Sequence, residues 1–249
     1  RQGFQPEDVP EVCRHLKEQS GVVARSVFSH LVGSDSYIFD DFTKKQLDTF
    51  TRVAAELEAG LEYKVIKHIL NSAGIERFTD YQMDMVRLGI GLYGVSASGQ
   101  KGLRNISTLK TTILQIQNVP AGDSIGYSRM SYVKRDSRIA IIPIGYADGL
   151  DRHFSNGGGE VVINGHRCPI IGNICMDACM IDVTDTDAHE GDSVIIFGEE
   201  LPVSELSDKL KTIPYEILTS ISPRVKRVYY RESVSYTHLR AHETGAYLV

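Results

Sequence analysis

The sequence predicts an α/β region followed by an all-β region. More fully, we expect the back half of a (β/α)8 barrel in residues 1–95, and then a β-rich, barrel-like C-terminal domain in residues 96–232. Strand-like and helix-like stretches alternate in the first region, which is typical of a parallel sheet. In the second region nearly every apolar stretch is short and bounded by turn residues, which is typical of antiparallel strands.

Three strand–helix units are expected in the first region. Residues 7–19 have the apolar spacing of a helix, and residues 22–31 follow as a strand. The clearest helix pattern lies in residues 41–60, where apolar side chains recur every three or four positions from Leu47 onward. Thr43 and Gln46 are expected to form a capping box at its start, and Gly60 is expected to stop it.

The remaining elements of the first region are predicted to be two strands and a short helix. These are a strand and turn at residues 63–74, a helix near residues 79–84 and a strand at residues 85–94. Three such units without a first half fit the back part of a barrel.

A linker-like stretch, residues 95–103, precedes the second region. Residues 107–116 alternate polar and apolar side chains, and Asn164-Gly165 between two apolar runs predicts a two-residue hairpin turn. Only residues 203–211 and 214–220 have helical character.

Composition excludes several classes of function. The 249 residues carry a formal charge of −5, so we expect neither a nucleic-acid partner nor a membrane-surface helix. No apolar run approaches the roughly 18 residues of a membrane span. The four cysteines lack C-x-x-C spacing, which predicts reduced thiols in a cytoplasmic protein and no metal site.

Both ends of the chain are unusual. The first residue is Arg rather than Met, so we expect the chain to begin inside a longer protein. Residues 233–249 change abruptly in character and contain "VSYTHLRAHET", which resembles a translated sequencing adaptor. We therefore expect a non-native, adaptor-derived tail and exclude it from the fold prediction.

Glycine and polar residues gather where the predicted barrel strands end. Gly89 would let backbone N–H groups approach an anion, and Ser72 would add a hydroxyl. Tight packing at a turn would explain the same glycines. His30 also lies at a strand end, where a core histidine is the alternative.

Six motifs together carry a family resemblance: "FSHL", "HILNSAGIERF", "DMVRLGIGLYG", "GYSR", "IPIGYADGL" and "GNICMDACMIDVT". Their order and spacing resemble the alanine racemases, fold-type III enzymes with a barrel domain that binds pyridoxal 5′-phosphate and a β-rich domain. The resemblance runs from Arg1 to Glu232. It is strongest to the racemases of Bacteroides-like bacteria, in which the racemase can follow a cell-wall peptide ligase in one chain.

The resemblance implies the activity and the assembly. A racemase of this family interconverts L-alanine and D-alanine by two-base proton transfer on the substrate joined to pyridoxal 5′-phosphate, and it supplies D-alanine for peptidoglycan. Its active site is shared between the subunits of a homodimer.

The resemblance assigns cofactor-binding roles to individual residues of this chain. Ser72 and the backbone amides of Gly89 and Ile90 match the residues that hold the phosphate. His30 matches a histidine lying against the cofactor ring, and Arg87 matches the arginine facing the pyridine nitrogen. Arginine stays protonated, so it donates a hydrogen bond there without handing over a proton.

Catalytic and substrate positions also carry over. Tyr127 matches the catalytic tyrosine that acts on the L-face. Met176 matches a position whose backbone contacts substrate, Asp177 is expected to order the same loop, and Tyr146 matches a tyrosine at the active-site entrance. Arg1 matches the arginine that meets the substrate carboxylate.

Two departures from the family pattern matter. Pro223 stands where many members have a tyrosine that touches the phosphate. The lysine that joins the cofactor and serves as the D-face base would lie upstream of Arg1, and Lys45, Lys64 and Lys67 are not in its context. We therefore expect the chain to be inactive by itself.

Three alternatives stay open at this stage. A fold-related decarboxylase is disfavoured by Arg87, because those enzymes place an acidic residue there. A racemase of broader amino-acid specificity stays open, because a pocket distinguishes two substrates that differ by one methyl group by only about 1–3 kcal/mol. A non-catalytic binding module would suit the missing lysine.

Overall fold

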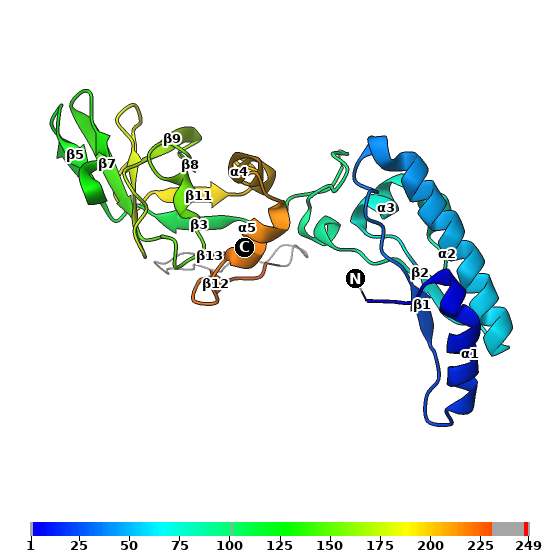
Figure 1. The fold of residues 1–249 in the computed structure, drawn as a ribbon. Coiled ribbons are helices and arrows are strands. Elements are labelled where there is room, and N and C mark those ends of the chain that lie inside the picture. Colours follow the sequence, from blue (N-terminus) through cyan, green and yellow to red (C-terminus); the bar gives the residue numbers. More distant parts are fainter. Residues whose placement is uncertain (1, 101, 231–246, 249) are drawn as a thin grey trace, which may run out of the picture. The chain divides into compact units, whose positions relative to one another are not determined.

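The structure is a computed structural model that describes residues 2–100, 102–230 and 247–248. The chain divides into two compact units, unit 1 (Arg1–Leu103) and unit 2 (Arg104–Val249) (Figure 1). Arg1 and residues 231–246 and 249 lie outside the described residues, so the predictions made for Arg1 and for most of the tail are not addressed by the structure.

Unit 1 is an α/β unit. In chain order its elements are η1 Pro6–Asp8, α1 Val9–Glu18, β1 Ser26–Phe28, η2 Tyr37–Phe39, α2 Asp40–Leu61, β2 Ile66–His68, α3 Ser72–Arg77, η3 Thr79–Tyr81 and η4 Ile90–Tyr93. Strands β1 and β2 pair in parallel, with Phe28 opposite His68 at their C-terminal ends. The predicted alternation is confirmed for α1, β1, α2 and β2, although the strands are short. Helix α3 lies where a turn was predicted, and the helix predicted near residues 79–84 is only the single turn η3.

Two apolar clusters hold unit 1 together, both along the long helix α2, which lies beside α1 in Figure 1. One face of α2 packs on residues that follow β1 and β2; this cluster consists of Leu31, Leu47, Phe50, Ala54, Ile69, Leu70 and Phe78. The last turns of α2 pack on α1 through Val9, Cys13, Leu57, Leu61 and Val65. The apolar spacing of the predicted helix therefore identified its buried face correctly.

The predicted range of α2, residues 41–60, was correct to within one residue at each end, but both predicted caps were wrong. The helix begins at Asp40 without a side-chain cap, and Thr43 is buried inside its first turns rather than capping it. Gln46 donates instead to the backbone oxygen of His30 at 2.8 Å. Helix α2 also continues past Gly60 to Leu61. Gly60 is needed for packing, since a Cβ there would lie 2.5 Å from the Cys13 sulfur.

The strand predicted at residues 85–94 is not found: the structure assigns no strand to this segment. Its first residues follow β2, where Asp84 N donates to Lys67 O and Arg87 N donates to Leu70 O. Beyond them the chain forms η4, and the amides of Gly89 and Gly91 donate to the Ser72 hydroxyl rather than to a neighbouring strand.

Unit 2 is β-rich, as predicted. Its strands are β3 Leu109–Thr112, β4 Gln115–Val119, β5 Ser124–Ile125, β6 Ser131–Tyr132, β7 Ser137–Ile142, β8 Glu160–Ile163, β9 His166–Ile171, β10 Cys179–Asp182, β11 Ser193–Phe197, β12 Lys226–Arg227 and β13 Tyr247–Leu248. The main sheet has the order β12-β13-β3-β11-β8-β9-β10-β7-β4, and β5 pairs with β6 separately. Helices α4 Val203–Leu210 and α5 Pro214–Ser220 occur where helices were predicted, and η5 Tyr127–Arg129 and η6 Arg152–Phe154 are single turns.

Two details of unit 2 test the pattern analysis. Asn164 and Gly165 have φ of 50° and 76°, and they join β8 to β9 in the predicted hairpin. Residues 107–116 form two strands rather than one, because β3 pairs with β11 whereas β4 pairs with β7.

Candidate functional site

The half-buried guanidinium of Arg87 connects the C-terminal ends of the two parallel strands. One of its nitrogens donates to the ring Nδ1 of His68 at 2.6 Å and to the His68 backbone oxygen at 3.1 Å. The other donates to the backbone oxygens of Ser29 at 2.6 Å and Ile69 at 3.3 Å, and lies 3.4 Å from His30 Nδ1. Arg87 and His30, two predicted site residues, are thus brought together.

His68 is a candidate site residue that was not predicted from the sequence. Its ring is buried and stacks on Phe28 with 5.2 Å between the ring centroids. Because an arginine can only donate, His68 Nδ1 must accept, which leaves this histidine neutral with its proton on Nε2. Burial, together with the positive charge of Arg87, lowers the pKa of His68, in agreement with the neutral ring. His68 is the last residue of β2 and His30 follows β1 by two residues, so a position near a strand end was the available signal.

A hydroxyl and two glycine amides meet beside this cluster. Ser72, the first residue of α3, accepts from Gly89 N at 2.9 Å and from Gly91 N at 3.2 Å. A Cβ at position 91 would lie 2.9 Å from Leu88 Cδ1, so a larger residue there would require the Leu88 side chain to move. The neighbouring Ile90 is buried. The glycines in this loop therefore allow the backbone to come close to Ser72. They also bring several N–H donors together in one place.

Tyr127 projects from an exposed turn of unit 2, with 71% of its surface accessible. The turn begins at Gly126 with φ of 74°, and Ser128 and Arg129 have φ of 62° and 50°. Left-handed backbone at two consecutive residues with side chains is uncommon and is retained only where the surroundings enforce it. The turn therefore holds the backbone beside Tyr127 in a constrained conformation.

Tyr146 and Met176 lie on two loops that touch through their backbones. Tyr146 N donates to Cys175 O at 3.1 Å, and Ala147 N donates to Met176 O at 2.9 Å. Gly145 allows this approach, since a Cβ there would lie 2.3 Å from Cys175 O. Tyr146 and Met176 are 45% and 57% exposed.

Asp177 is also exposed on the second of these loops. Four predicted site residues of unit 2 thus lie on loops, and three of them, Tyr146, Met176 and Asp177, lie on the touching pair.

Asp148 organises this part of unit 2 and was not predicted. Its buried carboxylate accepts from Gly145 N at 2.9 Å and from Arg224 Nε at 2.6 Å. Its backbone oxygen accepts from Ser222 N at 3.0 Å. The loop of Tyr146 is therefore joined to the segment that contains Pro223.

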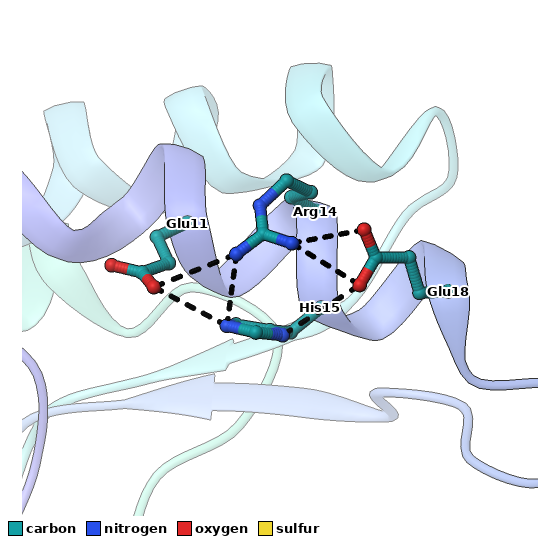
Figure 2. Close-up of polar contacts among 4 residues, drawn as sticks. All are labelled: Glu11, Arg14, His15 and Glu18. Carbon is teal, nitrogen blue, oxygen red and sulfur yellow. Dashed lines mark hydrogen bonds and ion pairs between the residues drawn. The ribbon is translucent and has the colours of Figure 1, made fainter.

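Other polar clusters do not have the character of a site. Glu11, Arg14, His15 and Glu18 form ion pairs along α1 (Figure 2), and each of these side chains is more than half exposed. Such pairs on a helix surface contribute only about 0.3–0.5 kcal/mol each.

Near the N-terminal ends of β1 and β2, Glu58 accepts from Lys64, Lys67 and the Val65 amide. The two lysines lower the pKa of Glu58 to about 2, which suits a structural ion pair. Within the described residues no three His, Cys, Asp or Glu side chains are grouped so as to hold a metal ion. In the same part of the chain, no helix combines the length and the apolar character needed to cross a membrane.

Comparison with known proteins gives the same family over both units. A family model described as "Alanine racemase, N-terminal domain" matches residues 1–97, and one described as "Alanine racemase, C-terminal domain" matches residues 106–229. Alanine racemase 2 of Caldanaerobacter subterraneus subsp. tengcongensis is 40% identical over 247 residues, which cover 94% of this chain and 63% of that protein.

Solved structures agree. Alanine racemase from Bartonella henselae with covalently bound pyridoxal phosphate is 35% identical with a TM-score of 0.82, covering 92% of this chain and 63% of its own. The alanine racemase of Clostridium difficile 630 in complex with cycloserine is 36% identical with a TM-score of 0.84, covering 91% and 62%. The chain thus spans about three fifths of the length of these relatives, from 62% to 63%.

Proposed function

Because the chain belongs to the alanine racemase family, we propose that it contributes to interconversion of L-alanine and D-alanine with pyridoxal 5′-phosphate as cofactor. The observation that carries the proposal is the Arg87 arrangement. A guanidinium held by strand-end carbonyls and a neutral histidine is a fixed cationic donor that cannot transfer its proton. An acidic residue at this place would favour the fold-related decarboxylases instead.

Unit 1 has groups that fit the cofactor's phosphate. Ser72 and the amides of Gly89 and Ile90 would hold it, and Gly91 keeps the space beside the Ser72 hydroxyl free of a Cβ. A phosphate carries close to two negative charges, and converging N–H dipoles can bind it without a lysine. Pro223 contributes no hydroxyl, so the donors of unit 1 would carry more of the binding.

Arg87 and His30 would hold the cofactor ring. When bound, pyridoxal phosphate supplies an electron sink for the charge left at the substrate Cα after its proton is removed. Arg87 would donate a hydrogen bond to the ring nitrogen, while His68 accepts from Arg87 and fixes its direction. His30, beside Arg87, would lie against the ring.

Tyr127 would remove or return the Cα proton on the L-face. The remaining groups of unit 2 would contact the substrate: Met176 through its backbone, with Asp177 ordering that loop and Tyr146 at the entrance. Arg1 would meet the substrate carboxylate. The exposed position of Tyr127 supports this role, since a proton-transfer group must reach a reacting atom outside its own loop.

The domain organisation, assembly and compartment are part of the same proposal. Unit 1 would be the back half of a barrel over residues 1–95, with the β-rich domain over residues 96–232 and an adaptor-derived tail at 233–249. The enzyme would be a cytoplasmic homodimer whose active site is shared between subunits. The free thiols of Cys13, Cys168, Cys175 and Cys179 support a reducing compartment.

The test is racemisation by the complete reading frame that contains this chain. We expect turnover of L-alanine and D-alanine, and a loss of kcat on the order of 10²–10⁴-fold in Tyr127→Phe, because proton transfer by a positioned group contributes about that much. Tyr132→Phe, an exposed tyrosine five residues away, should stay within about twofold of the parent, as expected for a surface change.

Equal loss in both variants, or racemisation that does not depend on Tyr127, would count against the assignment. We expect the 249-residue chain by itself to show no turnover above that of its Tyr127→Phe variant.

A further inference from the structure

The Tyr127 turn needs an anchor. Its tyrosine side chain is exposed, so packing of the ring does not fix it, and the backbone of Ser128 and Arg129 is left-handed. Backbone of this kind costs about 1–3 kcal/mol per residue and persists only where other contacts impose it. Those contacts decide where the phenol hydroxyl can go.

Asn173 makes the contact at the centre of the turn. Its residue surface is only 8% exposed, and its Nδ2 donates to the backbone oxygen of Tyr127 at 3.0 Å. A carbonyl oxygen can only accept, so the amide nitrogen of Asn173 must face it. The orientation of this side chain is thereby determined.

A chain of hydrogen bonds fixes Asn173 in turn. Its Oδ1 accepts from Asn156 Nδ2 at 2.9 Å, and Asn156 Oδ1 accepts from Ser131 Oγ at 2.7 Å. Ser131 Oγ accepts from Gly172 N at 3.1 Å. Each group therefore has one possible role as donor or acceptor, and the network cannot be reversed without losing a bond.

Close backbone packing accompanies the network. A Cβ at Gly126 would lie 3.3 Å from Asn173 N and 2.9 Å from Met180 Cε, so the start of the turn lies directly against the Asn173 segment. Asn173 O also accepts from Cys175 Sγ at 3.7 Å, one residue before Met176. Asn173 thus contacts both the Tyr127 turn and the loop that carries Met176.

We propose that Asn173 is the positioning residue for Tyr127: its buried amide holds the Tyr127 carbonyl and so places the phenol relative to the Met176 loop. This inference rests on the proposed function for its consequence in catalysis. The restraint on the turn itself is a separate property of unit 2. The side chain of Asn173 bonds Tyr127 and Asn156, so a change to this side chain would act on the reaction through Tyr127.

The first test measures the turn without any reaction. Asn173→Asp keeps the shape but replaces the donating amide with a carboxylate that only accepts at neutral pH. Trypsin cleaves after Arg129, which is exposed in this turn, and the rate is followed by mass spectrometry of the purified 249-residue chain.

We expect cleavage after Arg129 to be about tenfold faster in this variant, as for loss of a buried hydrogen bond. Asn118→Asp, the same chemical change on the exposed part of β4, should leave the rate unchanged. An unchanged rate in Asn173→Asp would overturn the proposal.

The second test measures catalysis in the complete reading frame. Asn173→Asp and Asn173→Ala should lower kcat about tenfold or more. The KM for alanine should stay within about twofold, because the Tyr127 turn is proposed to act in proton transfer and not in substrate binding. Cα-deuterated L-alanine should show a larger isotope effect than in the parent enzyme, and Cα-deuterated D-alanine a smaller one, since only the Tyr127 step is slowed.

These readouts separate two kinds of failure. Faster cleavage with unchanged kcat and isotope effects would show that Asn173 restrains the turn without positioning Tyr127, and it would overturn the inference. If the parent enzyme does not racemise alanine, the proposed function fails, and cleavage after Arg129 still decides whether Asn173 holds the turn. Circular dichroism of each variant checks that unit 2 remains folded.

Discussion

The two units hold their candidate site residues in opposite ways. In unit 1 the candidate side chain itself connects the two strands, since Arg87 donates to the carbonyls at the ends of β1 and β2. In unit 2 the side chains of the candidate residues Tyr127, Tyr146 and Met176 are exposed, and buried neighbours hold their loops through backbone atoms.

This difference has a consequence for mutation. Changes to the site of unit 1 should alter stability and function together, because the same atoms serve both. Changes to the exposed side chains of unit 2 should alter function alone, whereas changes to the supporting glycines and amides should alter both. Hydrogen exchange of backbone amides can measure each unit separately.

The largest effect is expected for Arg87→Met. Methionine keeps much of the apolar stem but leaves the Ser29 and His68 carbonyls without their charged donor. Hydrogen bonds to charged groups contribute about 1.5–3 kcal/mol each, so we expect a loss of about 3 kcal/mol in unit 1. Exchange at the amides of β1 and β2 should become about a hundredfold faster.

Arg52→Met is the matched control within unit 1. Arg52 is exposed on α2 and pairs only with Glu56 one turn away. We expect a change of less than about 0.5 kcal/mol. A similar loss in the two arginine variants would remove the distinction between the units.

A comparably large effect, of about 2 kcal/mol, is expected in unit 2 for Gly145→Ala. The added Cβ would lie 2.3 Å from Cys175 O and 2.5 Å from the carbonyl carbon of Met176, and backbone atoms cannot move aside as a side chain can. Exchange should accelerate in residues 145–150 and 173–178. In Gly21→Ala, where nothing lies within 4 Å of the new Cβ, exchange should not change. Little effect at Gly145 would mean that the two loops are not held through their backbones.

Sequence patterns predicted the parts of the fold that depend on local chemistry. The buried face of α2, the Asn164-Gly165 hairpin and the helices near residues 203 and 214 follow from spacing and turn preferences. The caps of α2 were predicted wrongly, because Thr43 is buried and Gly60 packs against Cys13, which is distant in sequence. Such contacts are decided by tertiary packing and override capping preferences.

The candidate site also contains residues that could be predicted from the sequence and residues that could not. Residues with distinctive chemistry inside a motif, such as Arg87 and Tyr127, could be chosen from the sequence. His68, Asp148 and Asn173 were not predicted, since their partners Arg87, Arg224 and Tyr127 lie far along the chain. The pairing of Ser72 with Gly91 as well as Gly89 also depends on how η4 turns, which no spacing rule gives.

The smallest effect on stability is expected for Tyr127→Phe and Tyr146→Phe. Both tyrosines are exposed, and removing a hydroxyl from an exposed ring should change stability by less than about 0.5 kcal/mol. Exchange rates throughout unit 2 should match those of the parent chain. This result would complete the contrast with Arg87. The residues proposed for function would then be dispensable for folding in unit 2 and required for it in unit 1. If either phenylalanine variant loosened unit 2 as much as Gly145→Ala does, the hydroxyl would be a structural group, and the exposed loops would be held by their side chains after all.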